Sequence, residues 1–515
     1  MAEPNQTLPQ SDSEGGEASS VPSFDDMIEI SLGNFGWTQL LQSLLVSLSM
    51  FFDAQQSFIS IFTDSHPPWH CTNNNLTSSC SSKTSDIICT IPRSSWAWDG
   101  LSSKTIISQW DLECASSFIT GLPQSSFFMG CLLSGFLLAT FVDSSFGRKN
   151  MLFLSCLTMS IASTLIVISS NVWVYSAFKF LIGFCRSSIG TCSLVLLTER
   201  VQKHWRVRVG VLNFIWFTLG FMSLPGIAYV NRDSLWKSLY LWTSLPGIFY
   251  AVFAYFFVTE SPRWLLMQGK EKEAMALLKG ITSASTEGGG TVTSSQLAVL
   301  AQQQSASTSN LYSSIRELCE KTWALKRLLA VMVLGFGIGM VYFGLPLNVG
   351  NLGFNIYLGT LFSAVLDTPT FIVTYYLMDN WRRKPSILGF SVASGISCLV
   401  CGVIRNKLHT VKLALALFSF FCIGTAFDMF LIYVIELFPT SVRNTATSMA
   451  RQAMIFGAIF GSFLISEGRK NDLFSYGVFG VIILCSASCL LFLSETKGIA
   501  LSDTMGQQER KESRN

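Results

Sequence analysis

The sequence predicts an all-α membrane protein with twelve transmembrane helices arranged as two six-helix repeats. Three observations lead to this prediction. Half of the 515 residues are hydrophobic and only 13% are charged, which is about half the charged fraction of an ordinary soluble chain. Apolar segments of about 20 residues, the length that a bilayer requires, recur along the chain. Charged landmarks repeat at a nearly constant offset in its two halves.

The twelve predicted spans are separated by connections of uneven charge. The spans lie at 39–62, 119–142, 150–169, 172–196, 208–230, 236–258, 327–347, 354–377, 386–404, 411–435, 446–466 and 474–494. Lysine and arginine are concentrated in the even-numbered connections, which places these connections and both termini on the cytosolic side. The lipid bilayer is therefore an expected partner. The net charge of +3 gives no reason to expect nucleic acid.

The two halves carry matching charged motifs at their even-numbered connections. An acid before a basic pair, an acid seven residues before an arginine, and an acid after the sixth span each occur twice, at offsets of 236, 237 and 235 residues. The main residues are Asp143, Gly147, Arg148, Lys149, Glu199 and Arg206 in the first half and Asp379, Arg383, Glu436 and Arg443 in the second. We interpret them as topology signals and as a gate, in which Arg148 and Lys149 pair with acids or helix C-termini of the opposite half.

Five segments follow from this pattern. Residues 1–36 lack a basic region and an apolar core, so they are expected to be a disordered acidic cytosolic tail and no signal peptide. The six-helix bundles occupy 37–258 and 326–497. A cytosolic linker at 259–325 joins them and contains a low-complexity stretch and a short amphipathic helix. A second cytosolic tail covers 498–515.

The polar loop at 63–118, after the first span, is expected on the non-cytosolic side. It contains a glycosylation sequon at Asn75. Its cysteines are disulfide candidates in an oxidising compartment, and the sequence leaves all three pairings open. They are Cys71, Cys80, Cys89 and Cys114.

Several motifs resemble one family of transporters. "DSSFGRKN", "LLTERV", "TESPRWLL", "IELFPTSVRN" and "SETKG", with the opening "SFDDMIEISLGNFGWTQ" and the Cys-rich first loop, resemble the organic cation/carnitine branch of the major facilitator superfamily. The Asp-Ser-Ser spacing before Gly-Arg-Lys is most like the plant members, and the resemblance covers Ser23 to Lys497. In the wider superfamily the acid stands three residues before the glycine, whereas Asp143 stands four before Gly147.

The resemblance implies secondary active transport of organic cations or carnitine by alternating access. By resemblance, a proton or sodium ion is the expected coupling ion, by symport, and the sequence leaves the ion and the direction of transport open. The vacuolar membrane is favoured over the plasma membrane. The sequence has no phosphate-binding loop for ATP, no catalytic motif and no metal-ligand spacing among its four histidines. We therefore expect neither an enzyme nor a cofactor or metal.

Ionisable residues inside predicted spans are functional candidates, because burying a charge in lipid is costly. Asp367 and Asp428 are the expected ligands of an ammonium group, because a carboxylate neutralises a cation that donates no hydrogen bonds. By resemblance, they occupy positions where cation-carrying relatives have acids. Asp53 and Arg186 either pair with each other or bind the coupling ion, and the sequence leaves this open.

Three further residues complete the predicted site. Family members often carry a charged residue at the position of Ile455, and Arg451 lies one helical turn earlier, where it could hold a carboxylate. An equally weighted alternative makes Arg451 a topology charge only. Tyr342 and Trp216 are candidates for a cation–π contact, against the alternative of ordinary packing. Two rival functions remain open: the same fold carrying a polyamine, sugar or organic anion, and a receptor that binds without transport.

Overall fold

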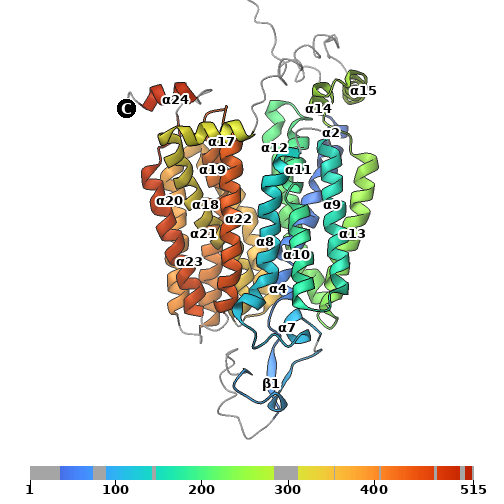
Figure 1. The fold of residues 1–515 in the computed structure, drawn as a ribbon, viewed down its shortest axis with the longest axis vertical. Coiled ribbons are helices and arrows are strands. Elements are labelled where there is room, and N and C mark those ends of the chain that lie inside the picture. Colours follow the sequence, from blue (N-terminus) through green and yellow to red (C-terminus); the bar gives the residue numbers. More distant parts are fainter. Residues whose placement is uncertain are drawn as a thin grey trace, which may run out of the picture.

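The structure is a computed structural model (Figure 1) that describes the residues at 35–72, 88–101, 103–141, 147–282, 311–352, 354–404, 408–468, 472–498 and 505–512. The predictions for the first 34 residues, the sequon Asn75, Cys80 and Asp143 lie outside these ranges. Asp379 is described only as part of its helix, without its side chain.

Among the described residues, twelve long helices form the two halves, six in each. The first half contains α2 (Trp37–Ser47), α3 (Ser49–Phe58) and α4 (Ser60–Thr63) in one continuous rod, then α8 (Ser117–Phe141), α9 (Arg148–Leu165) with η3 (Ile166–Ile168), α10 (Val172–Arg186) with α11 (Ile189–Thr198), α12 (Lys203–Val230) and α13 (Trp236–Phe257). The second half contains α18 (Thr322–Asn348), α19 (Ile356–Asn380) after η4 (Val349–Leu352), α20 (Arg383–Val403), α21 (His409–Leu437), α22 (Arg443–Gly468) and α23 (Asp472–Ala487) with η5 (Ser488–Phe492).

These helices agree with the predicted spans. Eleven helices among the described residues are long and apolar enough to cross a membrane. Helix α8 occupies the position of the twelfth predicted span, 119–142. Every helix end lies within five residues of its predicted position. Large apolar side chains such as Phe249 and Ile372 are exposed on the outside of the bundle, where a bilayer would cover them.

The two halves lie side by side (Figure 1), and each is built around its own hydrophobic cluster. The cluster of the first half also includes Ala364, Ala458 and Ile459 of the second. Between the halves, α8 packs against α22 and α12 against α19. We call the end that carries α7 (Ile106–Gln109), β1 (Trp69–Cys71), η2 (Arg93–Ser95) and β2 (Trp96–Trp98) the loop end. We call the opposite end, which carries α14 (Pro262–Met267), α15 (Glu271–Thr282), α17 (Leu311–Glu320) and α24 (Met505–Glu512), the linker end.

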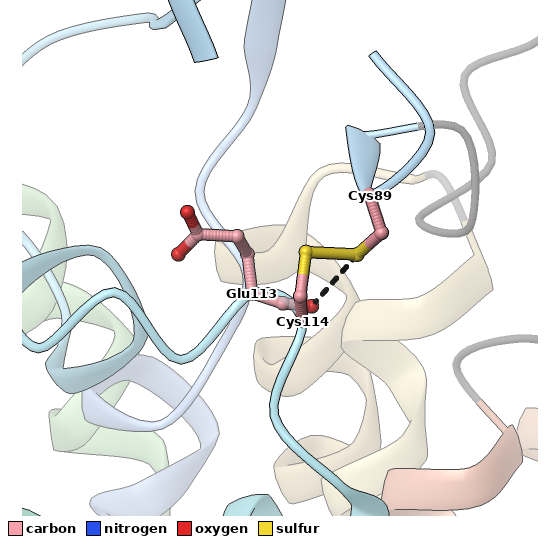
Figure 2. The surroundings of a disulfide bond; sticks show 3 residues. All are labelled: Cys89, Glu113 and Cys114. Atoms are coloured by element: carbon pink, nitrogen blue, oxygen red, sulfur yellow. Dashed lines mark hydrogen bonds between the residues drawn. A yellow bond between two sulfur atoms is a disulfide. The ribbon is translucent and has the colours of Figure 1, made fainter. Parts of the chain in front are cut away.

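The loop after the first span is held by a short antiparallel sheet and by disulfide bonding. Strands β1 and β2 pair, with Cys71 opposite Trp96. Cys89 and Cys114 form a disulfide whose Cα atoms are 5.6 Å apart, beside Glu113 (Figure 2). Cys71 is also disulfide-bonded. The structure therefore selects Cys89 with Cys114 from the pairings that the sequence left open.

Glycines allow helices of one half to approach within backbone contact. Gly130 of α8 lies against the carbonyl oxygen of Phe180, and Gly183 of α10 lies against that of Phe127. A Cβ atom at either position would overlap main-chain atoms, which cannot move as a side chain can. Small residues at helix contacts are the usual means of close packing in membranes.

We expect Gly183→Ala to destabilise the first half by about 3 kcal/mol, at the upper end of the usual cost of overpacking. This corresponds to a fall in Tm of about 5 °C or more in detergent. The matched control is Gly226→Ala in α12, where a Cβ atom meets nothing within 4 Å. The control is expected to leave Tm unchanged or raise it slightly, because alanine favours helix. Equal Tm values for the two variants would contradict the packing argument.

Candidate functional site

Asp367 lies in the middle of α19 and joins the two halves. Asn355 caps this helix by accepting hydrogen bonds from the main-chain nitrogens of Tyr357 and Leu358. The Asp367 side chain is 2% exposed. It accepts a hydrogen bond from the Thr218 hydroxyl of α12 and another from the Tyr342 hydroxyl of α18, each at 3.2 Å. One carboxylate therefore connects a helix of the first half with two helices of the second.

Aromatic rings surround the Tyr342 side of this carboxylate. Tyr342 stacks on Phe427 and Phe420 of α21, with ring centroids 4.3 and 5.6 Å apart. Phe343, next to it, meets Phe128 of α8 in the opposite half at 5.2 Å. Faces of aromatic rings attract cations, most strongly where water is excluded.

Asp428 lies next to Phe427 on α21, in the same region as Asp367. The two carboxylates are close enough for their charges to interact, and both interact electrostatically with the Tyr342 hydroxyl. Oδ2 of Asp428 is buried and has no hydrogen-bond partner in the described part of the chain. An unpaired polar atom in a buried place is costly, so this oxygen is suited to an incoming ligand.

Arg451 faces the first half of the protein. Ile455, one turn further along α22, packs against the core of the first half. The Arg451 side chain is exposed, yet it lies within electrostatic range of Arg186 of α10. The structure thus places Arg451 near a charged residue of the opposite half, and its role as a carboxylate ligand stays a prediction.

Asp53 and Arg186 form a buried ion pair. Nε and Nη2 of Arg186 donate to the two carboxylate oxygens of Asp53, each at 2.6 Å. Cys131 lies 3.8 Å from Nη1 of the same guanidinium. The sequence left two alternatives for these residues, pairing with each other or binding the coupling ion, and the structure contains the pairing.

Trp216 lies against Phe51 of α3, with ring centroids 6.3 Å apart. On the same helix, the residue that reaches Asp367 is Thr218, which the sequence reasoning missed. A single threonine in an apolar span carries no distinguishing signal, because a hydroxyl can also bond to its own helix.

A second buried charged cluster was also missed. Lys179 of α10 is buried and donates a hydrogen bond to Ser60 at 2.7 Å. Its ammonium group lies among aromatic rings, including Tyr240 at 5.4 Å. Tyr175 donates to the buried Asp64 at 2.8 Å. The signal was available, because a lysine inside a predicted span is itself a functional candidate.

The repeated motifs at the linker end make equivalent contacts in the two halves. The Glu260 carboxylate accepts hydrogen bonds from the main-chain nitrogens of Arg148 and Lys149, at 3.1 Å each. The Glu495 carboxylate accepts them from Arg383 and Lys384, at 3.0 and 3.3 Å. Both acids therefore cap the N-terminus of a helix, where negative charge is favourable.

These caps lie within one half each and involve main-chain nitrogens, so the expected pairing of the Arg148 and Lys149 side chains with the opposite half stays a prediction. Arg383 also forms an ion pair with Glu436 of its own half, with both N–O distances 3.2 Å. The physical reason is local, because each helix begins beside the acid that follows the sixth helix of its own bundle. Gly147 has a φ of +79°, and a side chain there would fall on the Glu260 carboxylate.

The other motif residues lie at the same end. Glu199 and Arg206 each keep a buried polar atom without a hydrogen-bond partner in the described ranges. Arg443 donates to the Phe438 carbonyl at 3.4 Å. Arg200 is buried and donates to Gln42 and Thr259 at 2.8 and 2.7 Å. Burial lowers the pKa of Arg200 to about 10, so it stays positively charged at neutral pH.

At the loop end, contacts join the two halves directly. Ser117 of α8 donates a hydrogen bond to Glu467 of α22. Phe118 stacks on Phe463 with centroids 5.4 Å apart. Tyr357 of α19 meets Phe62 at 5.5 Å and Tyr229 at 5.6 Å.

Comparison with known proteins places the chain among transporters. A model of the family described as "Sugar (and other) transporter" matches residues 69–505. "Organic cation/carnitine transporter 2" of Arabidopsis thaliana is 48% identical, covering 100% of this chain and 98% of the relative. "Organic cation/carnitine transporter 3" of the same plant is 47% identical, covering 95% and 94%.

Among solved structures, the inward-open xylose transporter XylE from E. coli is similar in fold. The TM-score is 0.63 at 17% identity, covering 90% of this chain and 98% of the other. A partially occluded inward-open structure of the same transporter also has a TM-score of 0.63. At this identity the likeness establishes the twelve-helix transporter fold and nothing about the solute.

Proposed function

Because the chain belongs to the organic cation/carnitine transporter branch of the major facilitator superfamily, we propose that it carries organic cations or carnitine across a membrane by alternating access. The fold is that of a secondary transporter and the chain is a multi-pass membrane protein. Its function is therefore transport and not catalysis.

The observation that carries the proposal is the acidic, aromatic site between the halves. Asp367 and Asp428 lie close together, and the Tyr342 ring lies beside both. A quaternary ammonium group offers charge and methyl surface but no N–H donor. Carboxylates and aromatic faces are the groups that bind such a cation.

Arg451 extends the site toward zwitterions. Its guanidinium can form two parallel hydrogen bonds to a carboxylate, and it lies within electrostatic range of Arg186 of the first half. In this proposal the acids hold the trimethylammonium group of carnitine and Arg451 holds its carboxylate. A carboxylate-free cation would use the acids alone.

The distribution of contacts supports an alternating mechanism. The halves are joined at the loop end through Tyr357, Phe118 and Ser117, whereas the linker-end caps lie within each half. We infer an inward-facing state with the loop end closed, in which the repeated linker-end motifs rearrange during gating.

The membrane and orientation are also part of the proposal. The basic connections at the linker end favour the cytosolic side for both termini. The disulfide between Cys89 and Cys114 supports an oxidising compartment for the loop end. We favour the vacuolar membrane over the plasma membrane, and tagged protein in plant cells would test this.

The experiment compares uptake of labelled carnitine and labelled tetraethylammonium into proteoliposomes by wild type and Arg451→Ala. Wild type is expected to transport at least one of the two solutes. Arg451→Ala is expected to lose about tenfold or more in carnitine uptake, as removal of one charged hydrogen-bonding partner predicts. Tetraethylammonium uptake is expected to change less than twofold.

The matched control is Arg382→Ala, which removes an exposed arginine at the start of α20. It is expected to transport both solutes as wild type does. Equal losses of the two solutes in Arg451→Ala would contradict the zwitterion assignment. Wild-type transport of neither solute would contradict the proposed substrate class and leave the fold unaffected.

A further inference from the structure

Asp367, which is buried, and Asp428, which is half-buried with its Oδ2 atom buried, lie on two packed helices. Helix α19 packs against α21. Thr370, one turn after Asp367, lies against Gly424, one turn before Asp428. Tyr342 donates to Asp367 and stacks on Phe427, the neighbour of Asp428. Thr370 and Tyr342 therefore both hydrogen-bond to Asp367 and both contact α21 within about one turn of Asp428.

No positive charge balances this pair in the described part of the chain. Asp367 accepts from two neutral hydroxyls, those of Thr218 on α12 and Tyr342 on α18. Asp428 interacts with the charge of Asp367 and with the hydroxyl of Thr370. Among the described residues, Tyr342 is thus the one other titratable group found to interact with the pair.

Two adjacent buried carboxylates do not both stay ionised without a cation, because each charge disfavours the other. In an empty site, the pair holds one proton and a net charge of −1. When a monovalent cation binds, it neutralises one carboxylate, and the proton leaves the other. The loaded site then contains two carboxylates and one cation, again with a net charge of −1.

We propose that the Asp367–Asp428 pair is the coupling site, at which one proton is exchanged for one monovalent organic cation in each transport cycle. The cation crosses in one direction and is released. A proton from that side then binds the pair and returns in the other direction. The result is antiport, whereas the family resemblance had implied symport.

The Asp53–Arg186 pair is less suited to this role. Both oxygens of Asp53 are held by one guanidinium at 2.6 Å, so its charge is already compensated. The unpartnered oxygen of Asp428 has no such competitor among the described residues.

The inference rests on the proposed function, and its test separates the two. Purified protein in weakly buffered detergent is titrated with tetraethylammonium, and binding is measured beside proton release with a pH indicator. We expect about one proton per cation bound. Asp428→Asn is expected to release none, whether or not it still transports. Asp233→Asn, in an 89% exposed acid, is the control and is expected to release as wild type does.

A second measurement uses wild-type proteoliposomes at zero membrane potential, with the interior one pH unit more acidic. One-to-one exchange predicts about tenfold accumulation of tetraethylammonium, since one pH unit is a tenfold proton ratio. Accumulation that follows the membrane potential and ignores pH would overturn the inference. So would binding without proton release, or unchanged release by Asp428→Asn. Failure of wild type to bind or carry both tetraethylammonium and carnitine would instead count against the proposed function.

Discussion

Asp367→Asn is expected to abolish tetraethylammonium uptake while leaving the protein folded. Asparagine has nearly the same shape, and its oxygen can still accept a hydrogen bond from Tyr342. The substitution removes the charge that the cation requires. Loss of one partner of a buried charge pair costs about 2 to 5 kcal/mol, so affinity is expected to fall about 30-fold to several-thousand-fold.

The measurement is initial uptake in proteoliposomes with equal amounts of reconstituted protein, together with Tm in detergent. Asp233→Asn is the control, because it removes the same charge from an exposed position between α12 and α13. We expect Tm within a few degrees of wild type for both variants. Uptake by Asp367→Asn within twofold of wild type would rule out Asp367 as a ligand of the cation and favour a neutral solute.

Asp53→Asn and Arg186→Gln are each expected to destabilise the first half strongly. Each substitution leaves the other partner of a buried ion pair uncompensated, which costs about 3 to 5 kcal/mol. The double variant Asp53→Asn/Arg186→Gln removes both charges and is expected to recover most of the lost stability. The measurement is Tm and the monodisperse fraction after size-exclusion chromatography.

This cycle separates a structural pair from a coupling site. A structural pair predicts low Tm in both single variants and a higher Tm in the double variant. If Asp53→Asn folds as wild type does and loses only the dependence of uptake on an ion gradient, the structural interpretation is wrong. Asp53 would then be the coupling residue, and the Asp367–Asp428 pair would not.

Local features of the sequence were sufficient to predict where the transmembrane helices lie. A bilayer requires about 20 apolar residues per span, so the boundaries of α9 and α23 could be predicted without any contact between them. The internal repeat could also be recognised in the sequence. In the structure, its equivalent residues Glu260 and Glu495 cap helices by accepting hydrogen bonds from equivalent main-chain nitrogens. The disulfide partner of Cys89 was not readable, because spacing does not decide which cysteines meet.

The candidate site was predictable in part, because a charge inside an apolar span is conspicuous. Asp367, Asp428 and Arg451 were identified in that way. Lys179 carried the same signal and was overlooked. Thr218 carried none, and its contact with Asp367 depends on how α12 of one half packs against α19 of the other.

The sequence by itself determined the fold class, the internal repeat and the charged residues within the spans, because each of these depends on composition or spacing along the chain, and its motifs carried the resemblance to the family. Only the tertiary structure decided the partners of those charges. It paired Asp53 with Arg186, placed Asp428 beside Asp367, turned Arg451 toward the first half and kept the Glu260 and Glu495 caps within their own halves. The physical reason is that a charge interacts with whatever lies within a few ångströms of it, and the packing of distant helices sets those neighbours.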